Sequence, residues 1–521
     1  DRLFGGRGND RLLGRDGAPD TLTCGAGRDV AIADAADLVR GCEDVRRPVA
    51  PVSPPPQPNP VSIENLKPGN PEWAAAPRAS GDAIEAYAQP TIAPGETLAF
   101  HVSARPAASY RIDVFRMGYY GGAGARLVAC LPGCDASAHA EPEAVPAASP
   151  EGLVHAGWPV SQSLVVPPDW ITGYYYAAVT LTSGPQRGSS HPVWLTVREA
   201  PEGRRAPILV QAATTTWQAY NGWGGGGAYG FNSPHGRHAS KFAFDRPSDA
   251  TSPAWPAGWE LPLVLFLERN GYDVAYQGDV DTARDPSSLD ARSLLIVGGH
   301  GEYWSKQTRD AFEHARAVGT NLAFMGANAA YWQVRYEDDF STIVSFKSAT
   351  ADPETDPALE TVQFRALVPP RYECALMGVQ HQGGKLDWTT DGDYTATESA
   401  VSDPWLRAGG FRPGDVLRGI VSREVDAVPW TETDGYSCGN KVTVLFTRKL
   451  GGNYKGDADA IRYTAPSGAK VFASGSHQFV WGLEDVPGVP IVHGLVDDRL
   501  RRFALAMFDD LSKGSRYPAP D

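Results

Sequence analysis

Several marks of well-known protein classes are missing from this chain of 521 residues. It has no apolar run close to the roughly 20 residues that a membrane-spanning helix needs. Its 47 lysines and arginines are scattered among 61 acidic residues, for a net charge of -14, so there is no basic stripe to bind phosphates. We therefore expect neither a membrane span nor a nucleic-acid partner.

The familiar catalytic motifs are missing as well. There is no Gly-x-Ser-x-Gly elbow, no P-loop, no dinucleotide fingerprint after the first strand of the α/β region and no His-Glu-x-x-His. A second histidine at metal-ligand spacing is also missing. Neither Cys374 nor Cys438 has the strand, turn and nearby histidine of a catalytic thiol. These absences argue against serine hydrolases, nucleotide enzymes, zinc proteases and glutaminase-like thiol enzymes.

Cysteine is scarce, with six residues that fall in pairs along the chain: Cys24 with Cys42, Cys130 with Cys134, and Cys374 with Cys438. One pair in each region predicts three disulfides and an oxidising compartment, against the alternative of six buried thiols. We expect a secreted or cell-surface protein of bacterial type. No signal peptide is present, and because the chain begins inside a repeat we expect a processed or trimmed fragment.

Residues 1–46 contain a glycine- and aspartate-rich nonapeptide pattern. Gly5-Gly6-x-Gly8-x-Asp10-x-Leu12 is followed by a degenerate unit with Asp20 and by Cys24-Gly25-x-Gly27-x-Asp29. The pattern resembles the calcium-binding repeats of secreted bacterial proteins. Glycine permits the tight turns and aspartate supplies hard oxygen ligands, so we expect Ca²⁺ at Asp10, Asp20 and Asp29. The alternative is a flexible glycine-rich tail.

The rest of the chain divides, by its composition and hydrophobic pattern, into a linker and two domains. Residues 47–60 form a proline-rich linker. Residues 61–200 hold short alternating or aromatic runs such as TLAFHVS, YRIDVFRM, YYYAAVTLTS and HPVWLTV, separated by turn signals, and predict a β-sandwich with Trp170 in its core. Residues 201–521 form the last domain.

Strands and helices alternate at the start of this last domain. APILVQA, YDVAYQ, SLLIVGG and NLAFMG are expected strands, and LPLVLFLERN and a segment capped by Ser305 are expected helices. This order predicts a doubly wound, parallel α/β domain of the flavodoxin or glutamine-amidotransferase kind. Residues 330–480 are strand-rich, and VDDRLRRFALAMFDDL predicts a final helix.

Polar and aromatic residues follow three of the expected strands. The first strand leads to TTTWQAYNGWGGGGAYGF, with Tyr220 and Tyr229; the third to HGEYW, with His300 and Glu302; and the fourth to GANAAYW, with Asn328. Ligands bind beyond the carboxyl ends of strands in open α/β sheets. We expect these residues to line one crevice, with four tryptophans as its walls: Trp217, Trp223, Trp304 and Trp332.

A carboxylate with phenols, without thiols or paired histidines, is a set of hard ligands that suits a highly charged cation such as Fe³⁺. Such an ion lowers the pKa of bound water and polarises a carbonyl, which are the two requirements of hydrolysis. The alternative is a purely structural role. In that case the tyrosines are packed aromatic residues, and Glu302 interacts favourably with the N-terminal end of a helix.

The chain resembles the large-subunit family of N,N-dimethylformamidase over about residues 62–512. Four motifs carry this resemblance: TWQAYN, GAYGFN, HGEYWS and GANAAYW. The resemblance implies a ferric ion held by Tyr220, Tyr229 and Glu302. It also implies supporting roles for His300 and Asn328 and, by order along the chain alone, for Lys347 and Glu424. At the second tyrosine this sequence has GAYGF where the family usually has Leu-Tyr-Asp. The match to the family motif is therefore weaker at Tyr229 than at Tyr220 or Glu302. The small partner subunit of the family is not in this chain.

We therefore expect a secreted, iron-dependent hydrolase of a carbon–nitrogen bond in a small amide. We expect Glu302 to bind the metal and His300 to hold water or take its proton. The alternative is a noncatalytic secreted protein that binds a carbohydrate or small molecule in the tryptophan-rich crevice. The sequence leaves open whether the chain forms a homo-oligomer.

Overall fold

The computed structural model describes residues 1–14, 18–34, 36–46, 58–233, 236–248, 256–381, 392–422, 424–429, 438–449, 457–489 and 494–517. By its internal contacts the chain forms two compact units, Asp1–Gln57 and Pro58–Asp521. The expected boundary near residue 200 lies inside the second unit. Part of the proline-rich linker, residues 47–57, lies outside the described residues.

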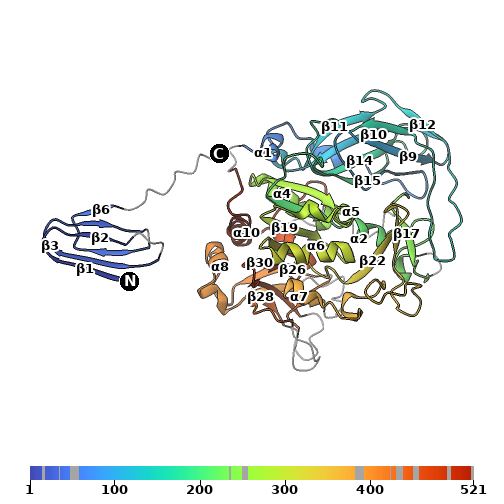
Figure 1. The fold of residues 1–521 in the computed structure, drawn as a ribbon. Coiled ribbons are helices and arrows are strands. Elements are labelled where there is room, and N and C mark those ends of the chain that lie inside the picture. Colours follow the sequence, from blue (N-terminus) through green and yellow to red (C-terminus); the bar gives the residue numbers. More distant parts are fainter. Residues whose placement is uncertain are drawn as a thin grey trace. The chain divides into compact units, whose positions relative to one another are not determined.

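The first unit consists of two three-stranded parallel sheets. One contains β1 (Arg2–Arg7), β3 (Thr21–Ala26) and β5 (Leu38–Arg40), and the other β2 (Arg11–Leu13), β4 (Val30–Ile32) and β6 (Asp44–Arg46). Successive repeats supply strands alternately to the two sheets (Figure 1). Leu12, Leu22 and Ala31 pack together between them. The apolar residue of each repeat thus forms the interior of this unit.

The β-sandwich expected from residues 61–200 is present at the start of the second unit. One sheet runs in the order β11 (Ala125–Leu131), β10 (Ala108–Met117), β14 (Gly173–Leu181), β15 (Ser190–Val197) and β8 (Thr91–Ile92), with β12 (Ala138–Ala140) also on β10. The other contains β13 (Gln162–Val165), β9 (Thr97–Ala104) and β7 (Ile84–Tyr87). Phe100, Ile112 and Val179 share one hydrophobic core, and the ring of Trp170 stacks on Tyr175 within it.

A nine-stranded mixed sheet forms the centre of the remainder. Five strands are parallel, in the order β18 (Val274–Gly278), β16 (Ile208–Ala212), β19 (Leu294–Gly299), β21 (Asn321–Gly326) and β30 (Lys470–Ala473). Four antiparallel strands follow: β29 (Ala458–Thr464), β28 (Thr443–Arg448), β25 (Gly392–Ala396) and β26 (Val416–Val421). The strand-rich stretch after residue 330 thus widens the same sheet.

Helices pack on both faces of the parallel strands because these strands are apolar on both sides. Ile208 and Ile296 share a core with α4 (Leu261–Arg269) and α10 (Asp498–Leu511). Leu209 and Leu295 share the opposite core with α6 (Lys306–Ala317). Ser305 accepts a hydrogen bond from Thr308 and caps α6, as its position predicted. The expectation of a multidomain, β-rich chain is confirmed.

A smaller sheet lies beside the carboxyl ends of the parallel strands. Its order is β17 (Lys241–Ala243), β23 (Thr342–Val344), β22 (Trp332–Glu337) and β20 (Tyr303–Ser305). Strand β20 begins directly after Glu302, so this sheet fixes the segment that carries HGEYW. The remaining described helices, including the 3-10 helices, are short: α1 (Pro60–Glu64), α2 (Thr214–Ala219), α3 (Pro256–Trp259), α5 (Asp279–Arg284), α7 (Glu373–Met377), α8 (Pro404–Gly409) and η8 (His477–Gly482), with others of three or four residues.

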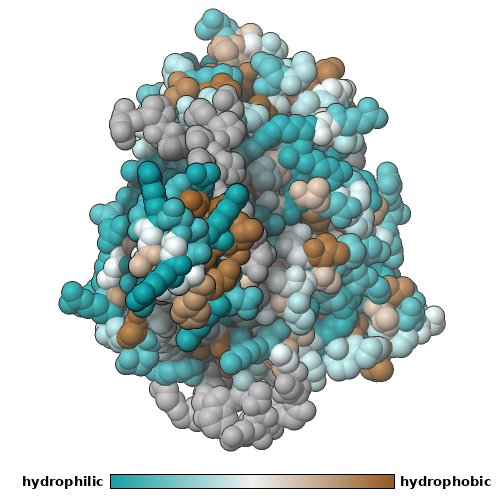
Figure 2. All heavy atoms as spheres, turned by 60° about the vertical axis from the view of Figure 1, so that its left-hand side comes forward, coloured by the Kyte–Doolittle hydropathy of each residue, from teal (hydrophilic) through white to brown (hydrophobic). Residues whose placement is uncertain are grey.

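All three expected disulfides are present, Cys24–Cys42, Cys130–Cys134 and Cys374–Cys438. Among the described residues, none of the helices combines the length and the apolar character that crossing a membrane demands. The face in Figure 2 is mostly hydrophilic, with hydrophobic residues in small groups.

Candidate metal and proton-transfer site

Four neighbouring parallel strands end at the same edge of the main sheet, and each leads into a polar segment. Strand β16 leads through α2 to Tyr220, β19 to His300 and Glu302, β21 to Asn328, and β30 to His477. Parallel strands place their carboxyl ends together, so segments far apart in sequence meet here. The convergence expected from the motifs is therefore present.

Two phenols hold the two oxygens of one buried carboxylate. Tyr220 donates a hydrogen bond to Oε2 of Glu302 across 2.8 Å, and Tyr229 donates to Oε1. Glu302 is fully buried and Tyr220 is 5% exposed. Nε1 of Trp332 donates to the Tyr229 hydroxyl across 3.2 Å. The structure thus brings together the three oxygen-bearing side chains that the sequence singled out.

Helix α2 and the HGEYW segment are joined by one threonine. The backbone N–H groups of Glu302 and Tyr303 both donate to Oγ1 of Thr216, across 3.1 and 3.2 Å. The carbonyl of Glu302 accepts from the N–H groups of Tyr331 and Trp332. These bonds fix the backbone on both sides of the carboxylate, so Tyr220 and Glu302 keep their separation.

Burial sets the proton affinities in this cluster. Burial and then the charge of Glu302 raise the pKa of both Tyr220 and Tyr229 far above the usual phenol value. Burial also raises the pKa of Glu302, but the hydrogen bond and charge of His300, with Lys347, outweigh it and hold that pKa below its usual range. The cluster by itself therefore holds one carboxylate and two neutral phenols.

Lys347 places a buried amino group beside these side chains. Its Nζ lies 3.3 Å from the ring centroid of Tyr229, 4.7 Å from Trp332 and 5.1 Å from Tyr303. Among the described residues it has no hydrogen-bond partner. Burial lowers the pKa of Lys347 to about 7, against the opposing charges of Glu302 and Glu424. Its order along the chain had suggested Lys347 as a supporting residue of the site, and in the structure Lys347 lies at the cluster.

Asn328 and Glu424 lie together at the same edge. Nδ2 of Asn328 donates to Oε2 of Glu424, while the backbone N–H of Asn328 is 2.9 Å from the buried Asp426. The φ of Asn328 is 52°, a left-handed conformation that asparagine tolerates. The Glu424 side chain is 27% exposed, so it forms the more open end of the cluster.

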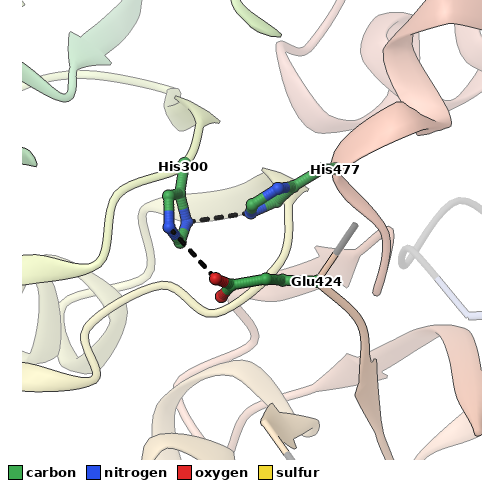
Figure 3. Close-up of side chains that lie close together, drawn as sticks. All are labelled: His300, Glu424 and His477. Carbon is green, nitrogen blue, oxygen red and sulfur yellow. Dashed lines mark hydrogen bonds and ion pairs between the residues drawn. The ribbon is translucent and has the colours of Figure 1, made fainter. Parts of the chain in front are cut away.

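His300 stands between Glu424 and a second histidine, His477 (Figure 3). Its Nε2 is 3.1 Å from Oε2 of Glu302, 3.2 Å from the Tyr220 hydroxyl and 3.7 Å from Oε1 of Glu424. Its Nδ1 is 2.8 Å from Nε2 of His477. Burial lowers the pKa of His300, but Glu424 and Glu302 outweigh it and raise that pKa to about 9.

His300, Glu424 and His477 have ligand-type atoms within 4.8 Å of one another. The contacts use opposite nitrogens of the His300 ring, however, with Nε2 facing Glu424 and Nδ1 facing His477. The two nitrogens of an imidazole point away from each other, so one ion cannot use both contacts. The two closest contacts are thus an ion pair from Nε2 to Glu424 and a hydrogen bond between Nδ1 and His477, while one ligand atom from each of the three residues still lies within metal-binding range of the others.

Three of the four expected pocket tryptophans contact other parts of the molecule. Nε1 of Trp217 donates to Glu260, and Nε1 of Trp223 donates to Glu85 of the β-sandwich. Trp304 is fully buried against Phe312 of α6. Alternation explains this last case, because Trp304 follows Tyr303 on β20 and points to the opposite side. Among the described residues, Trp332 is the one tryptophan of the four that hydrogen-bonds to the cluster, through the Tyr229 hydroxyl.

His477 and Asp426 are site residues that the sequence analysis missed. No second histidine stands at metal-ligand spacing in the sequence, yet the fold brings His477 to His300 across 177 residues. Ser-Gly-Ser-His follows the apolar strand VFA, so the strand-end pattern that identified His300 was available for His477 too. Its parallel pairing with β21 was not visible in the sequence.

The aspartates of the first unit link segments that are 17 to 19 residues apart, about two repeats along the chain. Oδ1 of Asp29 accepts from the N–H of Asp10, and Oδ1 of Asp37 accepts from the N–H of Asp20. The second carboxylate oxygens of Asp10 and Asp29 are buried and without a partner among the described residues. Calcium at these positions remains a prediction.

Comparison with known proteins gives a family. The family model described as "N,N-dimethylformamidase beta subunit-like, C-terminal" matches residues 111–491. An 82-residue stretch is 34% identical to the N,N-dimethylformamidase beta subunits of Paracoccus aminophilus and of an Alcaligenes species. That stretch is 15% of this chain and spans 11% of each relative's length. On the extent of the family match, the chain belongs to the N,N-dimethylformamidase beta subunit-like family.

Proposed function

We propose that this protein is a metal-dependent hydrolase of the carbon–nitrogen bond of a small amide, with Fe³⁺ held by Tyr220, Tyr229 and Glu302. The observation that carries the proposal is the hydrogen bonding of both phenols to the two oxygens of one buried carboxylate. The family's name adds support, because its relatives are N,N-dimethylformamidase beta subunits.

The donor set fits a hard, highly charged cation. Three oxygen donors from the segments that follow β16 and β19 are gathered together, and phenolate and carboxylate oxygens suit such ions. Burial and negative charge keep the phenols protonated in the bare cluster, so a strong cation is what would favour their ionisation. When bound, Fe³⁺ would polarise the amide carbonyl and lower the pKa of water.

The neighbouring side chains supply proton transfer. Hydrolysis requires that water lose a proton as it attacks the carbonyl carbon, and that the amine nitrogen gain one as its bond to carbon breaks. Glu424 and His300 are the groups placed to do this, 3.7 Å apart beside the oxygen donors. Asn328 holds Glu424 through Nδ2, and Lys347 contributes positive charge where the carbonyl oxygen becomes negative.

Three wider features belong to the proposal. The parallel strands, covered on both faces, form a doubly wound α/β domain with its site at the strand ends. Three disulfides support secretion or a cell-surface location. The relatives are named beta subunits, which supports action together with a second, smaller subunit.

A noncatalytic binding function has one separate observation in its favour. Tyr87, Trp194, Trp217 and Phe244 line a crevice between the β-sandwich and α2. Aromatic walls of this kind suit a sugar or other small molecule. This crevice is formed by residues other than the oxygen donors, so the two functions make different predictions.

The deciding experiment combines metal analysis with catalysis. Protein from an iron-supplied culture should contain close to one iron per chain and absorb visible light, since tyrosinate bound to Fe³⁺ is coloured. It should release amine from N,N-dimethylformamide or from a panel of larger secondary and tertiary amides. A colourless protein without iron, which binds sugars but releases no amine, would instead establish the binding function.

A further inference from the structure

Both edges of the His300 ring are occupied by different partners. Nε2 faces the oxygens of Glu302, Tyr220 and Glu424, whereas Nδ1 faces His477 Nε2 at 2.8 Å and the carbonyl of Ala327 at 3.4 Å. His300 is only 6% exposed, so no bulk water can replace a lost partner cheaply. The Nδ1 contacts therefore act together with the Nε2 contacts on the orientation of the ring.

We propose that His477 is the positioning residue that locks the His300 ring with Nε2 toward the oxygen donors. An imidazole can turn about its bond to Cβ and exchange a nitrogen edge for a carbon edge. Turned in that way, His300 would leave Glu302 and Glu424 without its N–H. The hydrogen bond between His300 Nδ1 and His477 Nε2 favours the orientation seen in Figure 3.

The Ala327 carbonyl strengthens this arrangement. Nε2 of His477 lies 3.1 Å from that carbonyl as well as 2.8 Å from His300 Nδ1. A carbonyl can only accept, so a hydrogen must lie on one of the two nitrogens that face it. Whichever histidine carries it, the bond between the rings is made and Nδ1 of His300 is satisfied.

His477 is itself held in place. Its ring packs against Trp259 at 5.5 Å, and Trp259 stacks on Trp481 at 5.3 Å. Nε1 of Trp481 donates to the carbonyl of Gly258 across 2.6 Å. His477 is 4% exposed and begins the 3-10 helix η8, which starts four residues after the last residue of β30. A side chain packed on an indole that is itself stacked on a second indole can fix its neighbour, as outer partners of catalytic and metal-binding histidines do.

The test exploits side-chain length. The amide of Gln reaches about as far as Nε2 of histidine, whereas the amide of Asn stops near Nδ1. We therefore compare His477→Gln with His477→Asn, and with His477→Ala as a second loss variant. Phe479→Leu is the control, because Phe479 lies in the same short helix and packs on Phe472 and Tyr394, away from His300.

The first readout is independent of catalysis. In the full chain labelled with ¹⁵N-histidine and stripped of metal, the His300 ring signals are those among its 11 histidines that vanish in His300→Gln. We expect His477→Asn and His477→Ala to shift these signals, with His477→Gln close to wild type and Phe479→Leu unchanged. Unchanged His300 signals in the Asn and Ala variants would overturn the proposal.

The second readout rests on the proposed function. In the iron-loaded enzyme we expect His477→Asn to lower kcat about 10- to 100-fold with little change in KM, and His477→Gln to recover most of it. Equal loss in the Gln and Asn variants would reduce His477 to a packing residue. If wild type hydrolyses no amide, the proposed function fails while the ring signals still decide the role of His477.

Discussion

The hydroxyl of Tyr220 lies 2.8 Å from Oε2 of Glu302, although the two residues are 82 positions apart and follow different strands of the sheet. Tyr229 occupies the other oxygen of the same carboxylate. In the bare cluster Glu302 is therefore the acceptor for both phenols, and its removal should affect all three ligands together. This relationship makes Glu302 the most informative position for substitution.

Replacing Glu302 with Gln should abolish iron binding and the associated colour. The amide keeps the shape of the side chain but loses the charge that a hard cation requires. His300→Ala should instead retain iron and colour and lose amide hydrolysis by about 10²- to 10⁴-fold, the usual effect of removing a proton-transfer group. Iron content, visible absorbance and amine release of both variants are measured beside wild type. Full iron content in Glu302→Gln would contradict the proposed ligand set.

Calcium should protect the first unit from proteolysis. Buried carboxylate oxygens of Asp10 and Asp29 lie close to the glycine turns without a partner among the described residues, and Ca²⁺ would satisfy them. We expect slower cleavage within residues 1–46 and a change in circular dichroism when calcium replaces a chelator. Asp29→Asn should weaken both effects. Asp44→Asn is the control, because Asp44 pairs with Arg46 at the surface; equal cleavage with calcium and with chelator would refute the prediction.

The disulfide between Cys374 and Cys438 should contribute more to stability than the one between Cys130 and Cys134. The first closes a sequence separation of 64 residues and the second a separation of four. Loop-closure entropy predicts a loss of about 4 kcal/mol for the paired serine variant of the long loop and about 2 kcal/mol for the short one. Urea unfolding of the two double variants measures the difference. Equal losses would show that native packing, and not loop length, decides the effect.

Glu260 should make stability fall between about pH 5 and pH 8. Burial raises its pKa from 4.5 to about 8, despite hydrogen bonds from Tyr174 and Trp217. In this interval the folded chain binds more protons than the unfolded chain, so rising pH favours unfolding. The stabilisation is complete below pH 4.5 and is lost by about pH 8, at about 1.4 kcal/mol for each unit of the pKa difference.

Unfolding free energies of wild type and Glu260→Gln across this interval test the point. Glutamine does not titrate, so wild type should lose stability relative to the variant as the pH rises, while the contributions of other groups cancel in the difference. Parallel stability curves for the two proteins would show that Glu260 keeps an ordinary pKa.

The sequence by itself located several secondary-structure elements and the polar residues that follow their strand ends. Period-two and helical patterns located β9, β10, β16, β19, α4 and α10 close to their observed bounds, because burial of one or both faces of an element constrains every residue along it. Motifs at strand ends identified Tyr220, His300, Glu302 and Asn328, because the carboxyl ends of parallel strands lie at one edge of the sheet. Cysteine positions predicted all three disulfides.

Only the tertiary structure decided which of these residues meet. The position of β30 beside β21, within a sheet that also contains four antiparallel strands, delivers His477 to His300 and lies beyond local patterning. Alternation along β20 turns Trp304 into the core and away from the site, and Trp223 bonds to Glu85 of the β-sandwich. Local sequence sets which side chains leave a strand end, but strand order in the sheet is set by packing over the whole chain, so the partners of His300 follow from the fold alone.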